Sequence, residues 1–129
     1  MRYCILAMAI GCLSALGAQA QGLRAVRPLP GYACMMLSSP PAATINAIRQ
    51  VPVRSSPSAS GAPAGWAPSI VIVSTPLEAA NGFLKATLPD GHKGWIAASD
   101  LKPWSSPYNP NRRCIPSVMS DGGLGFDFR

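Results

Sequence analysis

The chain has a single histidine and four cysteines, and these residue types could do chemistry. His92 would act as an acid, a base or a nucleophile's partner only with a second group positioned beside it. The carboxylates show no clear pairing with it in the sequence; they include Glu78, Asp90, Asp100 and Asp127. Asp90 is expected to serve a turn, and Asp100 to help cap a short 3₁₀ segment. An unrecognised enzyme site would have His92 as its best candidate, but we expect a solvated turn residue.

The cysteines fall into two pairs by position. Cys4 and Cys12 lie in an apolar N-terminal stretch, whereas Cys34 and Cys114 lie on either side of a long β-prone segment. An even pair in an exported chain indicates a disulfide, which here would tie the two flanks together. Two free buried thiols and half of a metal site are the alternatives. No further Cys or His lies nearby to complete a metal set, so we expect no metal.

The first 20 residues have the three parts of a secretory signal peptide. Arg2 supplies positive charge, residues 4–16 are apolar and uncharged, and Ala18-Gln19-Ala20 is an A-x-A cleavage site. The apolar run is shorter than the about 20 residues of a transmembrane helix. We predict a signal peptide over residues 1–20, cleaved after Ala20, and a periplasmic or secreted protein without a stable membrane span. Lipid attachment at Cys12 is disfavoured, because the apolar run before it would be very short.

The chain is basic, with 11 Lys and Arg against 5 Asp and Glu and a formal net charge of +6. Such a charge can attract nucleic acid, lipid headgroups or cell-wall polymers. The cations are scattered along the sequence, and Arg112-Arg113 is the single cluster. Nucleic-acid-binding domains concentrate their charge far more. We therefore expect no nucleic-acid partner, and the sequence also lacks phosphate-loop, zinc and nucleophile-elbow motifs, which predicts no cofactor and no enzyme activity.

The predicted fold class is all-β. The 14 prolines disfavour long helices, and short β-prone pieces recur between Pro, Gly and Ser. Residues 70–73 are β-branched throughout and predict a strand. Further extended segments are expected at residues 32–37, 51–53, 82–88, 94–97 and 114–119. Residues 55–65 predict a loop, Asp90-Gly91 a hairpin turn, and residues 98–101 a 3₁₀ turn.

Residues 44–104 resemble the bacterial SH3-like (SH3b) domain family. The family's Val-Asn-Val-Arg-Ser-Gly-Pro-Ser-like segment corresponds to residues 51–58, and its Gly-Trp-Val to Gly94-Trp95-Ile96. An apolar strand and a glycine–aromatic strand lie between them, and Leu101 follows the expected 3₁₀ turn. The chain differs from the family at Pro52, at Ser56 and at Phe83.

This resemblance implies a small SH3-like β-barrel with extended N- and C-terminal flanks. The flanks would be residues 21–43 and 105–129, with the SH3-like domain at 44–104 and a first strand at 44–48. Binding is the family's use of this fold, so the implied ligand is a cell-wall peptide or glycan, or a segment of an envelope protein. The candidate ligand-binding residues are Trp66, His92, Lys93, Trp95, Trp104 and Tyr108. For the bulky Trp95 and Phe83, core packing is the alternative role.

The C-terminal residues Leu124, Phe126 and Phe128 alternate with small or polar residues. This period of two is typical of a strand that joins the edge of a sheet, either in this chain or in a partner. Because Gly122-Gly123 precedes it, a frayed tail is favoured over that strand. The second functional hypothesis follows from the tail: a structural or assembly subunit of an envelope complex that docks through it.

Overall fold

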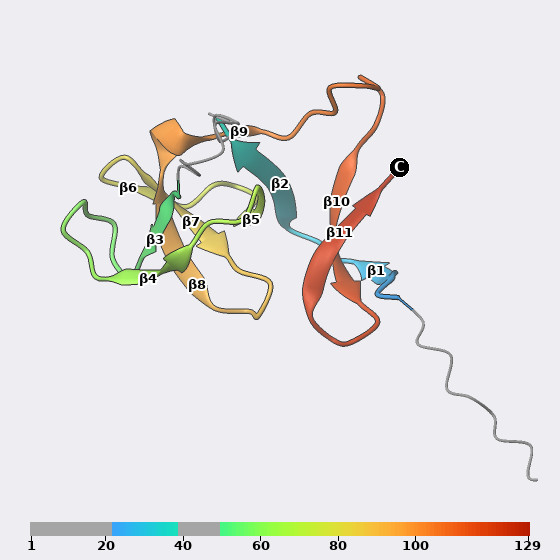
Figure 1. The fold of residues 1–129 in the computed structure, drawn as a ribbon, viewed down its shortest axis with the longest axis horizontal. Coiled ribbons are helices and arrows are strands. Elements are labelled where there is room, and N and C mark those ends of the chain that lie inside the picture. The colour runs from blue at the N-terminus through green and yellow to red at the C-terminus, as the bar shows by residue number, and fades with distance from the viewer. Residues whose placement is uncertain (1–21, 39–49) are drawn as a thin grey trace, which may run out of the picture.

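The computed structural model describes residues 22–38 and 50–129 (Figure 1). The predicted signal peptide, Cys12 and the predicted strand at 44–48 lie outside these residues. Within them the chain forms strands and one 3₁₀ turn, η1 (Ala98–Asp100), which confirms the all-β class. In this part of the chain, no helix has the length and apolar character that a bilayer crossing requires.

The strands form two antiparallel sheets. The small sheet has the order β1-β10-β11, from strands at Ala25–Pro28, Cys114–Met119 and Leu124–Phe128. The large sheet has the order β4-β3-β8-β7-β5-β2-β9, and β6 pairs with β7. Its strands are β2 (Tyr32–Leu37), β3 (Pro52–Arg54), β4 (Pro63–Trp66), β5 (Ile70–Ser74), β6 (Ala79–Ala80), β7 (Phe83–Thr87), β8 (Lys93–Ala97) and β9 (Leu101–Pro103).

The large sheet encloses a single hydrophobic core. Six of its strands contribute to one cluster, which contains Met35, Leu37, Val51, Val53, Val71, Val73, Leu84, Ala86, Ile96 and Leu101. Strands so far apart in the order share one cluster only if the sheet curls around it. The pairing does not close the sheet, because β4 and β9 end the order without pairing with each other. The closed small barrel expected from the sequence is therefore not confirmed.

Strand β5 is buried on both of its faces, which explains its continuous apolar sequence. Val71 and Val73 point into the core cluster, whereas Ile72 points to the outer face, and all three are at most 2% exposed. Ile72 lies opposite Cys34 on β2 and opposite Thr87 on β7, and both of these residues are also buried. The outer face of the large sheet is thus covered at this point.

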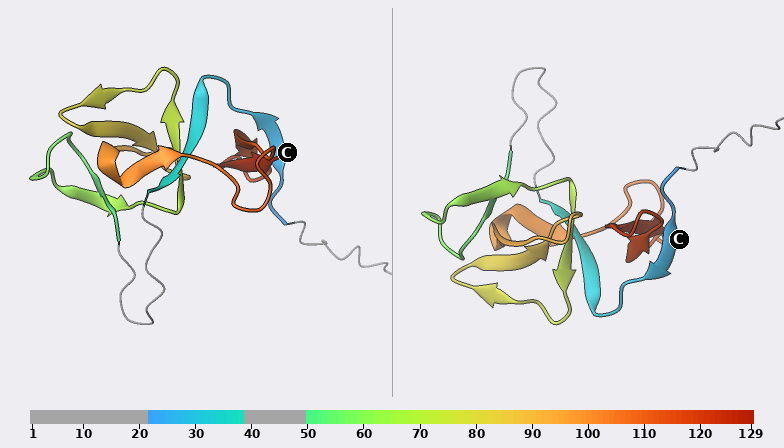
Figure 2. Two further views of the ribbon diagram at one scale, coloured as in Figure 1. Left: turned by 90° about the horizontal axis from the view of Figure 1, so that it is seen from above. Right: turned by 90° about the horizontal axis from the view of Figure 1, so that it is seen from below.

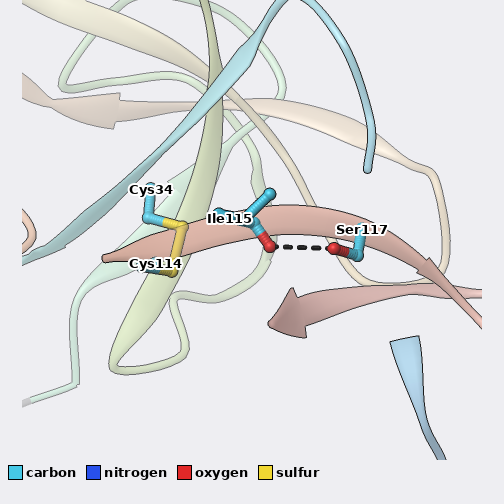
Figure 3. The surroundings of a disulfide bond; sticks show 4 residues. All are labelled: Cys34, Cys114, Ile115 and Ser117. Carbon is cyan, nitrogen blue, oxygen red and sulfur yellow. Dashed lines mark hydrogen bonds between the residues drawn. A yellow bond between two sulfur atoms is a disulfide. The ribbon is translucent and has the colours of Figure 1, made fainter. Parts of the chain in front are cut away.

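The small sheet covers this outer face, and three contacts place it there. Cys34 and Cys114 form a disulfide with a Cα–Cα distance of 6.1 Å, which confirms the predicted pairing (Figure 3). The Leu124 amide donates to the Pro89 carbonyl at 3.2 Å, and the Trp104 and Phe128 ring centroids lie 5.4 Å apart. Figures 1 and 2 show the small sheet beside β2, on the side away from β3 and β4.

Beyond the disulfide, Figure 3 shows how β10 is held locally. The Ser117 hydroxyl donates to the Ile115 carbonyl at 3.0 Å, and Ser117 is only 1% exposed. This bond satisfies a buried polar group, which would otherwise destabilise the sheet. Pro116 lies between them, opposite Phe126 of β11.

Several strands differ from the sequence-based expectation, and β1 and β6 are strands that it does not contain. The predicted loop at 55–65 ends earlier, because Pro63–Trp66 forms β4 and pairs with β3. Leu101–Pro103 forms β9, which pairs with β2. The C-terminal alternation forms β11 on the chain's own β10, so these residues are not a frayed tail. Strand β2, which the predicted division assigns to the N-terminal flank, lies inside the large sheet.

Gly94 permits the close approach of β8 to β3. A Cβ at this position would overlap Cγ1 of Val53 and lie 3.2 Å from the Arg54 carbonyl oxygen. Val53 is completely buried and has little room to move. The packing of β8 on β3 therefore requires the glycine of the Gly-Trp-Ile motif, independent of any family resemblance.

We predict that Gly94→Ala lowers the free energy of unfolding by about 1–3 kcal/mol, because the added methyl overpacks the core against Val53. Urea denaturation measures the change. Gly22→Ala is the matched control, since no atom lies within 4 Å of a Cβ at that position. Equal stability of the two variants would contradict the close packing of β3 and β8.

We also predict that Cys34→Ala/Cys114→Ala lowers the free energy of unfolding by about 2–4 kcal/mol, because the disulfide closes a long loop in the unfolded chain. The two residues are 80 positions apart. Urea denaturation of the oxidised, reduced and double-variant proteins provides the measurement. The reduced protein should match the variant, and non-reducing mass spectrometry that finds two free thiols in the native protein would refute the disulfide.

Candidate functional site

One part of the large sheet's outer face is left uncovered by the small sheet. Strand β8 alternates, so that Gly94 and Ile96 point inward and Lys93 and Trp95 point outward. Trp95 lies directly opposite Arg54 of β3 and Lys85 of β7. Residues directly opposite in a sheet share a face.

Strand β4 adds a second tryptophan to this face. Trp66 lies opposite Pro52, which is on the same side of β3 as Arg54. Its side chain is 58% exposed. We call the surface formed by Arg54, Trp66, Lys85, Lys93 and Trp95 the aromatic–cationic face.

Three contacts hold the side chains of the aromatic–cationic face in place. The Lys85 ammonium lies 5.8 Å from the Trp95 ring centroid, which is within the range of a cation–π contact. The same ammonium lies 3.5 Å from a carboxylate oxygen of Glu78. Arg54 donates from Nη1 to the Gly61 carbonyl at 3.0 Å and so anchors the loop between β3 and β4. Trp95 is half-buried by these neighbours.

His92 and Asp90 form a contact at the exposed tip of the β7–β8 hairpin. The Asp90 carboxylate accepts from the His92 amide at 3.0 Å, and its other oxygen lies 2.7 Å from Nδ1 of His92. Gly91 has a φ of 88°, the left-handed conformation that the Asp-Gly turn requires. Asp90 therefore serves the turn as expected, and it also pairs with His92, which the sequence did not indicate.

This pairing shifts both titrations. The hydrogen bond to Asp90, together with the carboxylate charge, raises the pKa of His92 above 6.5. The same side-chain hydrogen bond, helped by the backbone bond, lowers the pKa of Asp90 below 3.8. The His92 contribution to stability is present at low pH and is lost as pH rises through its raised pKa. The Asp90 contribution is lost as pH falls through its lowered pKa. The contact between the two side chains therefore stabilises the hairpin tip at pH values between the lowered pKa of Asp90 and the raised pKa of His92.

The pair has the geometry of a base and its orienting carboxylate, and among the described residues neither a pocket nor a nucleophile adjoins it. The His92 and Asp90 side chains are 83% and 60% exposed, so water surrounds both. No nucleophile contacts His92 in the described ranges 22–38 and 50–129. The same residues enclose no pocket and contain no group of three His, Cys, Asp or Glu suited to a metal.

The six predicted ligand-binding residues do not lie together. Trp66, Lys93 and Trp95 lie on the aromatic–cationic face, and His92 lies at the adjacent hairpin tip. Trp104 instead packs on Phe128 where the two sheets meet, and Tyr108 is 95% exposed in the segment between β9 and β10. Lys85 was absent from the predicted set, although its alternation with Leu84 and Ala86 signals an outward position.

Comparison of the chain with protein-family models, with curated proteins and with solved structures found no match. The SH3b resemblance therefore stays a prediction from sequence. The candidate site depends on the geometry of the aromatic–cationic face.

We predict that Asp90→Asn lowers the pKa of His92 toward 6.5, because the amide removes both the charge and the carboxylate acceptor. NMR titration of the His92 ring protons measures the shift. Glu78→Gln, which removes a carboxylate from Lys85 instead, should leave the titration in place. An unchanged His92 pKa in the Asp90 variant would mean that the hairpin-tip contact is absent in solution.

Proposed function

We propose that the protein is an exported, non-enzymatic SH3-like binding module of the SH3b type. The ligand is a cell-wall peptide or glycan, or a segment of a partner protein, bound on the aromatic–cationic face. The observation that carries the proposal is the alignment of Trp66, Arg54, Trp95 and Lys85 across four strands of one uncovered surface.

The order of elements supports the SH3-like part of this proposal. Strands β3, β5, β7 and β8 occur along the chain in the order of the family pattern, with an Asp-Gly turn between β7 and β8. The short strands β4 and β6 lie between them. The 3₁₀ turn η1 leads into Leu101, which is 7% exposed and belongs to the core cluster. A single cluster inside a curled sheet is what a small barrel-like domain needs.

The residue types on the face favour an extended ligand with apolar planes and anionic groups. Exposed tryptophan rings offer flat apolar area with a polar N–H, which suits sugar rings and peptide side chains. Arg54, Lys85 and Lys93 would meet carboxylates of a wall peptide. No pocket encloses the face within the described residues, so a polymer that lies across it fits better than a small molecule.

The disulfide supports the exported location. Disulfides such as Cys34–Cys114 form and persist in oxidising compartments, including the periplasm and the extracellular space. The signal-peptide pattern at residues 1–20 predicts the same location from an independent part of the chain.

We predict that Trp66→Ala weakens sedimentation with purified cell wall at low salt by about tenfold, because a large aromatic side chain carries much of the energy of such an interface. Its 58% exposure means that the fold should tolerate the change. Leu23→Ala is the matched control, since Leu23 is 64% exposed and precedes β1 of the small sheet. If the wild-type chain does not sediment with cell wall, the wall-binding function fails.

The alternative function is an assembly subunit of an envelope complex. Strand β11 ends the small sheet with β10 on one side, which leaves its other side as an edge for a partner strand. Affinity purification from the envelope separates the two functions. A partner protein that co-elutes equally with wild-type and Trp66→Ala protein favours the assembly role.

A further inference from the structure

The small sheet concentrates positive charge that is scattered in the sequence. We call residues 22–29 and 105–129 the arginine-rich unit. It contains five arginines against two aspartates, a net charge of +3: Arg24, Arg27, Arg112, Arg113 and Arg129 against Asp121 and Asp127. The other described residues contain four Lys and Arg against three Asp and Glu, a net charge of +1.

The same unit also carries most of the exposed large apolar side chains. Four of the six found among the described residues belong to it: Leu23, Val26, Tyr108 and Phe128. Tyr108 is 95% exposed, which places nearly its whole ring in water. Arginines interspersed with exposed apolar residues form an amphiphilic surface, not a simple solubilising one.

The charge is densest where the β10–β11 ladder ends. Arg113 and Arg129 exchange both backbone hydrogen bonds, at 2.7 and 3.0 Å, so their side chains lie directly opposite on one face. Like charges in this arrangement repel. Asp127 pairs with Arg129 at 2.9 Å, which leaves a positive surplus at Arg113.

One aromatic ring adjoins Arg112. The Arg112 guanidinium lies 5.8 Å from the Phe128 ring centroid, and Phe128 packs on Trp104 at 5.4 Å. Tyr108 belongs to the segment that leads into Arg112. Arginine beside aromatic residues is the combination that anchors proteins at membrane–water interfaces.

We propose that the ladder end of the arginine-rich unit, formed by Arg112, Arg113 and Tyr108, docks on a membrane surface rich in anionic phospholipid. Lipid phosphates lie between and over the arginines and relieve the repulsion of Arg113 and Arg129, while the exposed ring of Tyr108 enters the headgroup layer. An extended lipid surface fits better than a soluble anion, because no pocket encloses these arginines in the described chain. This docking is independent of the aromatic–cationic face.

Vesicle sedimentation tests the proposal, with the oxidised chain from Gln21 onward, after removal of the predicted signal peptide. The protein should sediment with vesicles of phosphatidylcholine plus phosphatidylglycerol, and not with phosphatidylcholine alone. Arg112→Gln/Arg113→Gln should weaken the binding by about 25-fold, since each arginine near the surface contributes about fivefold. Tyr108→Ser should also weaken it without disturbing the fold, because the side chain is almost fully exposed.

Lys93→Gln/Lys102→Gln is the matched control, because it removes the same charge from the large sheet. This variant should retain most of the binding, and thermal melts should show that all variants fold. If both double variants lost the same amount of vesicle binding, the binding would depend on net charge alone and the proposal would be overturned. Displacement by inorganic phosphate at the vesicle phosphate concentration would also overturn it, because the site would then take a free anion. Trp66→Ala should bind the vesicles normally. A failure of the membrane proposal can therefore be distinguished from a failure of the cell-wall proposal.

Discussion

Pairing of β2 with β5 is the interaction on which both sheets depend. Val71 and Val73 build the core on one side of this pair, and Cys34 and Ile72 accept the small sheet on the other. A chain of this size buries a modest share of its surface, so two-sided burial of one strand pair uses its apolar residues efficiently. The disulfide between Cys34 and Cys114 then fixes the small sheet on the large one, and so adds a covalent link to a limited apolar contact.

This arrangement also decides which surfaces remain for binding. The outer face of the large sheet is one continuous surface, covered near Ile72 and Thr87 and open near Lys85 and Trp95. The small sheet therefore limits the aromatic–cationic face on one side. It also presents its own arginines elsewhere. The packing of the small sheet on the large one therefore leaves two chemically different surfaces. We propose a cell-wall or protein ligand for the aromatic–cationic face and an anionic membrane for the arginine-rich unit.

Local features could be predicted from sequence because their causes are local. The β-branched run at 70–73 and the turn at Asp90-Gly91 depend on residues within a few positions. Strand β4 was missed because Pro63 and Gly65 are typical loop residues, and only its pairing with β3 makes it a strand. Trp104 is a candidate ligand-binding residue from the sequence alone, because its packing partner, Phe128, is distant in sequence. Pairing between distant segments depends on the whole fold, and it decides which predicted site residues meet.

The composition of the small sheet has a consequence for the order of assembly. Strand β1 comes from the N-terminal part of the described chain, whereas its neighbours β10 and β11 come from the C-terminal part. The large sheet can form as soon as β9 has been synthesised, but β1 has no partner until β10 follows. During synthesis from the N-terminus, β1 would therefore remain unpaired until β10 has formed. Among the described residues, the arginine-rich unit is the last part that can complete its sheet.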